Sequence, residues 1–272
     1  MCNGDSLIGE ILANPRLFIK STEPVRDTVG DYLAAVGAGV VTFWPRRANE
    51  AIICDDLSAL IKYPMPHDSV ATPLYHITDV SNLPGILAAG GLRSDVGMAA
   101  AAHEVIGYDH IKQRRMTELT VPCRGGRFVG EFVPFYFCPR SPMLYTINLG
   151  NTGRPAGCQS SIVHLVSTIG AAVETGSDWA FSNGNAGSRY ADFFADLHAL
   201  ATLDWEIIGS NDWGGDNRRN KKASEFLVAD FFPWKAINTI GCHNHQTAGH
   251  VSELLEGLLD SPNVAVKSDW YY

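Results

Sequence analysis

The feature that most constrains the fold is a series of short apolar segments that lie between residues 74 and 228. Such segments are typical of strands buried in a sheet. They do not alternate regularly with helical patterns, as the strands of a doubly wound parallel sheet would. The sequence therefore predicts an α+β domain, with strands expected at residues 74–77, 135–138, 144–148, 162–167 and 225–228.

Helices are expected where apolar residues recur at helical spacing between these strands. The first should begin at Ser81, whose hydroxyl can cap a helix, and end at Gly90 and Gly91, which tolerate a left-handed backbone. The remaining helical patterns occupy residues 109–119, 189–208 and 252–259.

The N-terminal quarter of the chain has a pattern of its own. Residues 5–14 and 27–35 have helical spacing, and the β-branched runs at 39–44 and 50–54 could pair as a hairpin. Three prolines between residues 64 and 73 then interrupt the pattern and indicate a domain boundary. We therefore expect an N-terminal extension over residues 1–72, to which the sequence assigns no role, followed by one domain over residues 73–272.

Composition and charge exclude several classes of protein. Of the 272 residues, 46% are hydrophobic, and no apolar run approaches the ~18 residues that cross a bilayer. The six cysteines are far apart, which fits neither a disulfide scaffold nor a zinc ribbon. With no signal peptide either, the chain is expected in the reducing cytoplasm. The 21 Lys and Arg against 29 Asp and Glu give a net charge of −8, so any contact with nucleic acid must be local.

Standard catalytic motifs are absent: the sequence holds no P-loop, no Gly-x-Ser-x-Gly elbow and no His-Glu-x-x-His helix. Candidate residues come instead from less standard segments. One places His76 and Thr78 at the end of an expected strand, before a helix start whose free amides favour an anion. Another is the basic pair Arg114 and Arg115. The alternative for His76 is a hydrogen-bonded histidine that only packs in the fold, and the alternative for the arginine pair is a solvated basic face.

Two further segments combine positive charge with rigidity or acidity. In the run 133–144, three aromatic residues and three prolines surround Arg140 and could hold it against a phosphate or a base; the alternative is a core strand with a tight turn. Glu225 follows a basic loop at residues 218–222, which suits a carboxylate beside a polyanion; the alternative is a surface loop. Metal-ligand residue types near the C-terminus match no standard zinc spacing, so no metal is expected at Cys242, His243, His245 and His250.

Taken in order, these segments resemble one family. The order is Tyr75-His76-Ile77-Thr78, then residues 110–115, then the Pro-Phe-Tyr-Phe-Cys-Pro-Arg-Ser-Pro-Met run at 134–143, then Ser224-Glu225-Phe226-Leu227-Val228. The sequence is similar to the DarT-type DNA ADP-ribosyltransferases, the toxin half of a toxin–antitoxin pair, and to their thymidine-modifying branch. The resemblance runs from about Leu74 to the end of the chain.

The resemblance implies an ADP-ribosyltransferase fold, in which a split, twisted β-sheet with flanking helices opens a cleft for NAD. It implies that Arg115 and Glu225 are catalytic, that residues 98–117 form an NAD-binding element, and that no metal is needed. Contacts to NAD are implied for His76, Ile77, Thr78, Gly85, Arg93 and Arg115. Contacts to DNA are implied for Tyr108, His110, Arg140, Ser141, Met143 and Asn185. One departure is that a Ser-Asn-Gly-Asn motif ends at Asn185, where Thr-Asp-x-His is expected.

The implied reaction transfers ADP-ribose from NAD to N3 of thymine and releases nicotinamide. Single-stranded DNA is the expected substrate, because N3 is paired with adenine in a duplex. Glu225 would stabilise the positive charge that develops on the ribose. Arg115, with a pKa above ~12, would stabilise the thymine anion or the NAD pyrophosphate rather than act as a base. The aromatic residues that could stack on bases are Phe135, Tyr136 and Phe137.

The same resemblance implies a toxin that arrests growth or defends against phage. Its implied partner is a cognate antitoxin, a macrodomain with DNA ADP-ribosyl glycohydrolase activity that reverses the modification. Two other interpretations stay open. One is an enzyme of the same fold that acts on protein or RNA and is indifferent to thymine. The other is a catalytically weak DNA-binding module, which the departure at Asn185 suggests.

Overall fold

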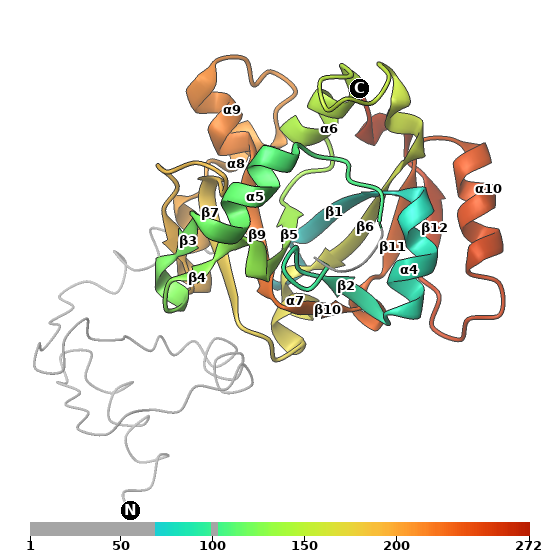
Figure 1. Cartoon of the computed structure of the whole chain (residues 1–272), viewed down its shortest axis with the longest axis horizontal. Coiled ribbons are helices and arrows are strands. Elements are labelled where there is room, and N and C mark those ends of the chain that lie inside the picture. The colour runs from blue at the N-terminus through green and yellow to red at the C-terminus, as the bar shows by residue number, and fades with distance from the viewer. Residues whose placement is uncertain (1–68, 99–102) are drawn as a thin grey trace, which may run out of the picture. The chain divides into compact units, whose positions relative to one another are not determined.

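The computed structural model describes residues 69–98 and 103–272 (Figure 1). The elements predicted at residues 5–14, 27–35, 39–44 and 50–54 lie outside the described residues. The same is true of nearly all of the predicted extension over residues 1–72. The described residues therefore comprise almost all of the domain predicted over residues 73–272.

An eight-stranded sheet forms the centre of this domain (Figure 1). Its strands are β1 (Pro73–Asp79), β5 (Phe132–Tyr136), β6 (Ile162–Thr168), β7 (Trp179–Asn185), β8 (Phe193–Phe194), β9 (Ser224–Ala229), β11 (Thr239–Cys242) and β12 (Asn263–Val266). They are ordered β12-β11-β6-β1-β5-β9-β7-β8, and the pairs are antiparallel except for β11 with β12. The predicted fold class, a twisted sheet with flanking helices, is confirmed.

Helices and two small sheets accompany the central sheet. The helices are α4 (Leu83–Ala88), α5 (Asp109–Thr117), α6 (Pro142–Asn148), α7 (Ile169–Glu174), α8 (Trp205–Gly209), α9 (Asp216–Lys222) and α10 (His245–Leu254). The small sheets pair β2 (Gly91–Arg93) with β10 (Phe231–Pro233), and β3 (Thr120–Val121) with β4 (Arg127–Phe128). Every helix in residues 69–98 and 103–272 is too short or too polar to traverse a bilayer.

The central strands form where apolar side chains can be buried together. All six residues of β9 are buried, and so are the first six of β6. Phe226 on β9 pairs with Phe135 on β5 and with Phe181 on β7, and all three rings are fully buried. Burying one such side chain stabilises the fold by about 1.5–3 kcal/mol. These residues therefore fix the middle of the sheet, on which the candidate site is built.

The register of three central strands brings candidate residues into one row. Tyr136 on β5 pairs with Tyr75 on β1 and with Glu225 on β9. His76 directly follows Tyr75. The strand segments predicted to carry an NAD contact and a catalytic carboxylate therefore lie in the same part of the sheet.

Two predicted elements are wrong. Residues 144–148, expected as a strand, belong to α6, because the Ser141 hydroxyl caps that helix through Leu144 N (3.2 Å) and Pro142 occupies its first turn. The helix expected over residues 189–208 does not form. This region holds β8, a short 3₁₀ helix and α8 instead. Asp196 and Asp204 cap the last two, which interrupts the helical spacing of the apolar residues.

Three further boundaries differ from the sequence prediction. Ser81 is not a cap; Asp79 accepts a hydrogen bond from Ser81 N (3.0 Å), and α4 begins only at Leu83. The helix predicted over residues 252–259 lies earlier in the chain, because Asn244 caps α10 through the backbone amide of Thr247 and the helix ends at Leu254. The basic loop predicted over residues 218–222 lies within helix α9.

Candidate active site

A bidentate ion pair joins Arg115 on α5 to Glu225 on β9. Arg115 Nη1 donates to Glu225 Oε1 (3.1 Å), and Arg115 Nη2 donates to Glu225 Oε2 (3.0 Å). The two side chains are 12% and 2% exposed, so water competes little for these bonds. Two parallel bonds from a planar guanidinium fix the orientation of both groups. The fold thus brings together the two residues predicted to be catalytic, which lie 110 positions apart in the sequence.

Strand β7 holds Glu225 from a second side. The backbone amide of Ala186 donates to Glu225 Oε1 (3.2 Å), and the backbone amide of Glu225 donates to the Ser182 hydroxyl (3.2 Å). The end of β7 is tied to α9 as well, because Asn185 N donates to Asn220 Oδ1 (3.2 Å). The carboxylate is therefore positioned by elements that come from three separate parts of the chain.

The electrostatic surroundings keep Arg115 charged. Burial alone would lower the pKa of its guanidinium, but the Glu225 carboxylate raises that pKa above its ordinary value. Burial also raises the pKa of Tyr136 well above its usual range, and Glu225 adds to this effect. At neutral pH the site therefore presents a guanidinium that cannot give up its proton and a neutral phenol.

His76 lies on β1 as a neutral ring. Its Nδ1 donates to the carbonyl oxygen of Pro134 (2.8 Å), which assigns the ring proton to Nδ1 and leaves Nε2 as an acceptor. Burial lowers the pKa of His76 below its ordinary value. An acceptor nitrogen in a partly buried setting suits a hydroxyl group, such as those of a ribose.

The other predicted NAD contacts on β1 and α4 differ in what they offer. Ile77 is buried and packs with Leu144 and Ile147, so its side chain is not available to a ligand. The Thr78 hydroxyl accepts a hydrogen bond from Asn82 Nδ2 (3.1 Å) and has a proton left to donate. Gly85 is exposed, and no atom lies within 4 Å of the position that a Cβ would take there. The space above Gly85 is therefore open.

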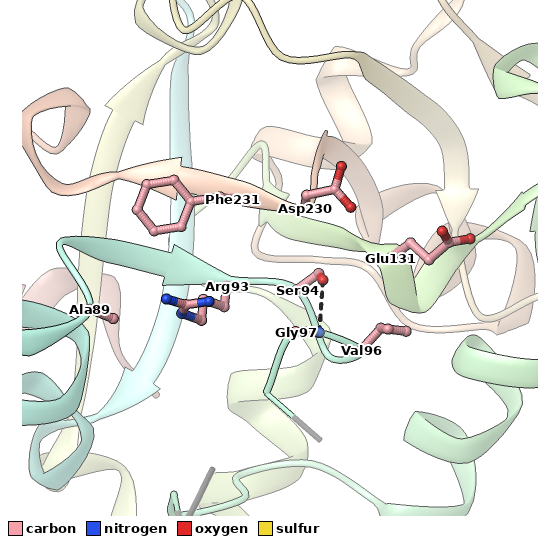
Figure 2. A pocket seen from close by; sticks show the side chains of 8 residues that line it. All are labelled: Ala89, Arg93, Ser94, Val96, Gly97, Glu131, Asp230 and Phe231. Atoms are coloured by element: carbon pink, nitrogen blue, oxygen red, sulfur yellow. Dashed lines mark hydrogen bonds between the residues drawn. The ribbon is translucent and has the colours of Figure 1, made fainter. Parts of the chain in front are cut away.

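Arg93 lines a cavity of about 410 Å³ beside β2 and β10 (Figure 2). Its guanidinium carbon lies 6.0 Å from the centroid of the Phe231 ring. The loop after β2 is fixed by a hydrogen bond from Gly97 N to the Ser94 hydroxyl (3.2 Å). This loop also carries Asp95, whose charge acts on His76 and on Arg115. The residues that line the cavity are Ala89, Arg93, Ser94, Val96, Gly97, Glu131, Asp230 and Phe231. Glu131 and Asp230 flank the ends of β5 and β9 that lie opposite Tyr136 and Glu225.

Asn82 fastens the segment that leads into α5. Its Nδ2 donates to the Glu104 carbonyl oxygen (2.9 Å), and its Oδ1 accepts from Glu104 N (2.7 Å). The Glu104 carboxylate in turn accepts a hydrogen bond from Arg154 Nη1 (2.9 Å), and Arg154 also pairs with the buried Asp79. Asn82 therefore ties the beginning of the predicted NAD-binding element to β1, where His76 and Thr78 lie.

We predict that Asn82→Ala raises the KM for NAD by about tenfold and changes kcat by less than about threefold, because two hydrogen bonds to one backbone segment are lost. Steady-state kinetics at saturating DNA would measure both constants. Asn263→Ala, at an exposed position on β12, is the matched control and should leave the KM for NAD unchanged. An unchanged KM in Asn82→Ala would show that this clamp does not position the NAD-binding element.

Except for Asn185, the residues predicted to contact DNA lie around the beginnings of α5 and α6. Tyr108 and His110 are neighbours, with ring centroids 5.3 Å apart. Met143 on α6 lies close to the same segment, because its methyl carbon would be 3.3 Å from a Cβ added at Gly107. These three side chains are at least partly exposed. They therefore form one surface that a nucleic acid could reach.

Arg140, Ser141 and Asn185 have local partners. The Arg140 guanidinium carbon lies 4.6 Å from the centroid of the Tyr272 ring, and the Tyr272 hydroxyl donates to the Arg140 carbonyl oxygen (2.8 Å). The Ser141 side chain is fully buried as the cap of α6. Asn185 is exposed at the end of β7, and its Oδ1 accepts from Gly187 N (2.8 Å). Asn185, the residue that departs from the expected motif, thus shapes the loop that comes after it.

The predicted stacking role of two aromatic residues is wrong. Phe135 is fully buried, with its ring centroid 4.7 Å from that of Phe232. Phe137 is 6% exposed and packs edge-on against Trp205. Both belong to the main hydrophobic core, so neither can stack on a base. Phe135 on β5 and Phe137, which directly follows the strand, lie on either side of Tyr136 and both point into the core.

Most of the basic side chains that precede Glu225 are engaged within the protein. Arg218 donates to the Asp212 carbonyl oxygen, and Lys221 pairs with Asp204 (2.9 Å). Lys222 is 1% exposed and donates to the Ile208 carbonyl oxygen (2.8 Å), and its burial lowers its pKa. Arg219 is exposed. Little of the positive charge in this segment is therefore available to bind phosphates.

Three groups that act on the site were not predicted from the sequence. Ser182 and the amide of Ala186 position Glu225, and Asn82 holds the segment before α5. The backbone amide carries no sequence signal at all. Ser182 lies in the motif that the resemblance singled out, and Asn82 lies shortly after His76. Both are close to predicted site residues, but no sequence pattern indicates their own roles. Within the described residues no group of three or more His, Cys, Asp or Glu side chains is arranged to hold a metal ion.

Comparison with known proteins gives consistent matches. The family described as "ssDNA thymidine ADP-ribosyltransferase, DarT" matches residues 75–272. A "DNA ADP-ribosyl transferase" from Thermus sp. (strain 2.9) is 39% identical over 213 residues, which cover 77% of this chain and 98% of the relative. A protein of the same description from Mycobacterium tuberculosis is 29% identical over 214 residues, which cover 76% of this chain and 90% of the relative.

Two solved structures of the Thermus sp. 2.9 protein match this fold. The structure of DarT in complex with ADP-ribosylated ssDNA matches with a TM-score of 0.70 and 38% identity, and covers 77% of this chain and 98% of that chain. The structure in complex with NAD+ matches with a TM-score of 0.67 and 36% identity, and covers 78% of this chain and 100% of that chain. The described domain is therefore similar to these proteins over nearly all of their length.

Proposed function

The chain belongs to the DarT family of single-stranded DNA thymidine ADP-ribosyltransferases, and we propose that it transfers ADP-ribose from NAD to N3 of thymine in single-stranded DNA and releases nicotinamide. The match to relatives described as DNA ADP-ribosyl transferases and to structures with NAD+ and with ADP-ribosylated ssDNA supports this proposal. The single observation that carries it is the buried, bidentate pair of Arg115 and Glu225.

Glu225 acts on the NAD side of the reaction. When the bond between nicotinamide and ribose breaks, positive charge develops on the ribose, and a fixed carboxylate stabilises that charge most where water is excluded. Glu225 meets both conditions, because it is 2% exposed, its carboxylate accepts hydrogen bonds from Arg115 and the Ala186 amide, and its own backbone amide donates to the Ser182 hydroxyl. Its carboxylate needs no reorganisation as the charge appears.

Arg115 acts on the thymine side. A new bond forms between N3 and C1′ of the ribose as the bond between C1′ and nicotinamide breaks; nicotinamide leaves as a neutral base, and the N3 proton passes to water. Arg115 does not take that proton, because Glu225 holds the pKa of its guanidinium above an already high value. Its fork of N–H donors instead stabilises negative charge on the thymine ring through paired hydrogen bonds. Arg115 lies 3.0 Å from the carboxylate that serves the ribose, so both partners of the transfer meet there.

NAD and DNA reach this centre from neighbouring surfaces. For NAD we propose the acceptor nitrogen of His76, the hydroxyl of Thr78, the open space at Gly85 and the guanidinium of Arg93, with Ile77 contributing its backbone. For DNA we propose the surface formed by Tyr108, His110, Arg140, Met143 and Asn185, with Ser141 contributing as the cap that holds α6.

The biological role is inferred from the family. We propose that the protein acts in the cytoplasm as the toxin of a toxin–antitoxin pair, with growth arrest or phage defence as its outcome. Its partner would be an antitoxin with macrodomain-type DNA ADP-ribosyl glycohydrolase activity. A solved DarTG protein of Thermosipho africanus shares the fold, at 20% identity and a TM-score of 0.58. We assign the activity to residues 73–272.

A panel of acceptors tests the proposal. The protein is incubated with labelled NAD and, in separate reactions, a single-stranded DNA with one thymine, the same strand with cytosine in its place, its duplex, an RNA strand and a mixture of proteins. We expect label on the thymine-containing single strand alone. Labelling of RNA or of proteins would favour the alternative acceptors, and binding of DNA without nicotinamide release would favour a DNA-binding module.

A further inference from the structure

The loop after β7 is closed by its own hydrogen bonds. At its base the Asn183 and Asp192 side chains and backbones bond reciprocally, at 2.9 to 3.1 Å. Within it the Ser188 amide donates to the Asn185 carbonyl oxygen (2.8 Å), and the Ser188 hydroxyl accepts from Tyr190 N (3.2 Å). Such bonds define the backbone of a turn without help from a bound ligand. The loop is therefore preformed.

The loop also borders the reaction centre. The Ala186 amide donates to the Glu225 carboxylate (3.2 Å). A Cβ added at Gly187 would lie 3.7 Å from Ile111, which is one helical turn before Arg115 on α5. The guanidinium of Arg189 lies 3.6 Å from Glu118, just after the end of α5. The loop thus spans from the catalytic carboxylate to the helix that carries Arg115.

At its tip this preformed loop displays an aromatic ring. Tyr190 is 90% exposed, although aromatic side chains normally bury most of their surface. The neighbouring Arg189 side chain is 75% exposed, and its ion pair with the half-exposed Glu118 contributes little in water. An exposed ring beside an exposed cation is the combination that single-strand binding proteins use, because bases stack on the ring while the cation meets the phosphate.

We propose that Tyr190 stacks on a nucleobase that neighbours the target thymine, with Arg189 against the adjoining phosphate, so that this loop selects a strand whose bases are unpaired. This inference rests on the proposed function. It adds a binding residue that lies outside the sequence motifs, since Tyr190 is four residues beyond the amide that holds Glu225. A stacked neighbour would hold the target thymine beside Arg115 while it is unpaired.

The test measures the KM for DNA with single-thymine strands in which each neighbouring nucleotide in turn is abasic. We expect Tyr190→Ala to raise the KM for the intact strand by about tenfold, and Tyr190→Phe to resemble the wild type, because stacking uses the ring and not the hydroxyl. For the strand that lacks the base on which Tyr190 stacks, the wild-type KM should also rise by about tenfold. Wild type and Tyr190→Ala should then have the same KM for that strand. Leu259→Ala, a fully exposed apolar residue near the end of α10, is the matched control and should change nothing.

The outcomes separate this inference from the proposed function. If wild-type protein modifies none of the strands, the proposed function fails and the inference fails with it. If wild-type protein modifies thymine but Tyr190→Ala has the same KM, the function stands and the stacking role is wrong. An equal effect of Tyr190→Ala on every abasic strand would also overturn it. Thermal unfolding of Tyr190→Ala should match that of the wild type, since the ring contributes no buried surface.

Discussion

Replacing Glu225 by Gln should lower the kcat for DNA ADP-ribosylation by about a thousandfold. Gln has nearly the same shape as Glu and keeps one acceptor oxygen, so the backbone of β9 and the bond from Ala186 can persist. What it lacks is the negative charge that stabilises the ribose in the transition state. Single-turnover rates at saturating NAD and DNA measure this loss without a contribution from weaker binding.

The same substitution leaves the Arg115 guanidinium, 12% exposed, without its counter-charge. We expect the free energy of unfolding to fall by about 3 kcal/mol, so the rates must be compared well below the midpoint of thermal unfolding. Glu118→Gln is the matched control, because Glu118 also pairs with an arginine of α5 but is 47% exposed. It should retain wild-type activity. A folded Glu225→Gln protein with more than about a tenth of the wild-type rate would contradict the electrostatic role of Glu225.

Arg115→Lys should lower the rate of DNA modification by about a hundredfold, although it keeps the positive charge. Lysine cannot make two parallel hydrogen bonds to one planar group, so it would release both the Glu225 carboxylate and the thymine ring from their fixed orientation. Arg115→Ala should lose more, because it also removes the charge. Rates for both variants at saturating substrates would establish the order.

The neighbouring Arg114 supplies the control for this experiment. It lies on the same helix, but its side chain is 36% exposed and pairs with Glu118 on the surface at 3.3 Å. Arg114→Lys should therefore keep its activity. An Arg115→Lys protein with most of its rate intact would argue against paired recognition and would leave charge as the only contribution of Arg115.

The sequence predicted those parts of the site that depend on local pattern. Strands were expected around His76 and Glu225, and a helix around Arg115, and all three are present. The two apolar strand segments are mostly buried in the sheet, and the polar segment that forms α5 has no buried residue. The resemblance to a family then supplied the roles of these residues, which periodicity alone could not.

Long-range features could not be predicted in the same way. The pair of Arg115 and Glu225 depends on the sheet order, which places β9 beside β5 and brings α5 to the end of both. Strand β7 was not expected, because the polar run Ser182-Asn183-Gly184-Asn185 lacks the residues that favour strands. Its pairing with β9 compensates for that weak propensity. The prediction that Phe135 and Phe137 stack on bases was wrong because residue type does not show whether a ring is exposed. Their burial follows from the place of β5 between β1 and β9 in the sheet.

The most direct test of the account compares two single-stranded oligonucleotides that differ by one methyl group. One contains a single thymine and the other a single 3-methylthymine. In 3-methylthymine a methyl group replaces the proton on N3, so N3 cannot form the new bond to the ribose. Each is incubated with NAD and with wild-type or Glu225→Gln protein, and the intact mass of the strand is measured. The account predicts one ADP-ribose adduct on the thymine strand with wild-type protein and none in the other three reactions. An adduct of equal yield on the 3-methylthymine strand would contradict transfer to N3, and one of equal yield with Glu225→Gln would contradict the catalytic role of the carboxylate.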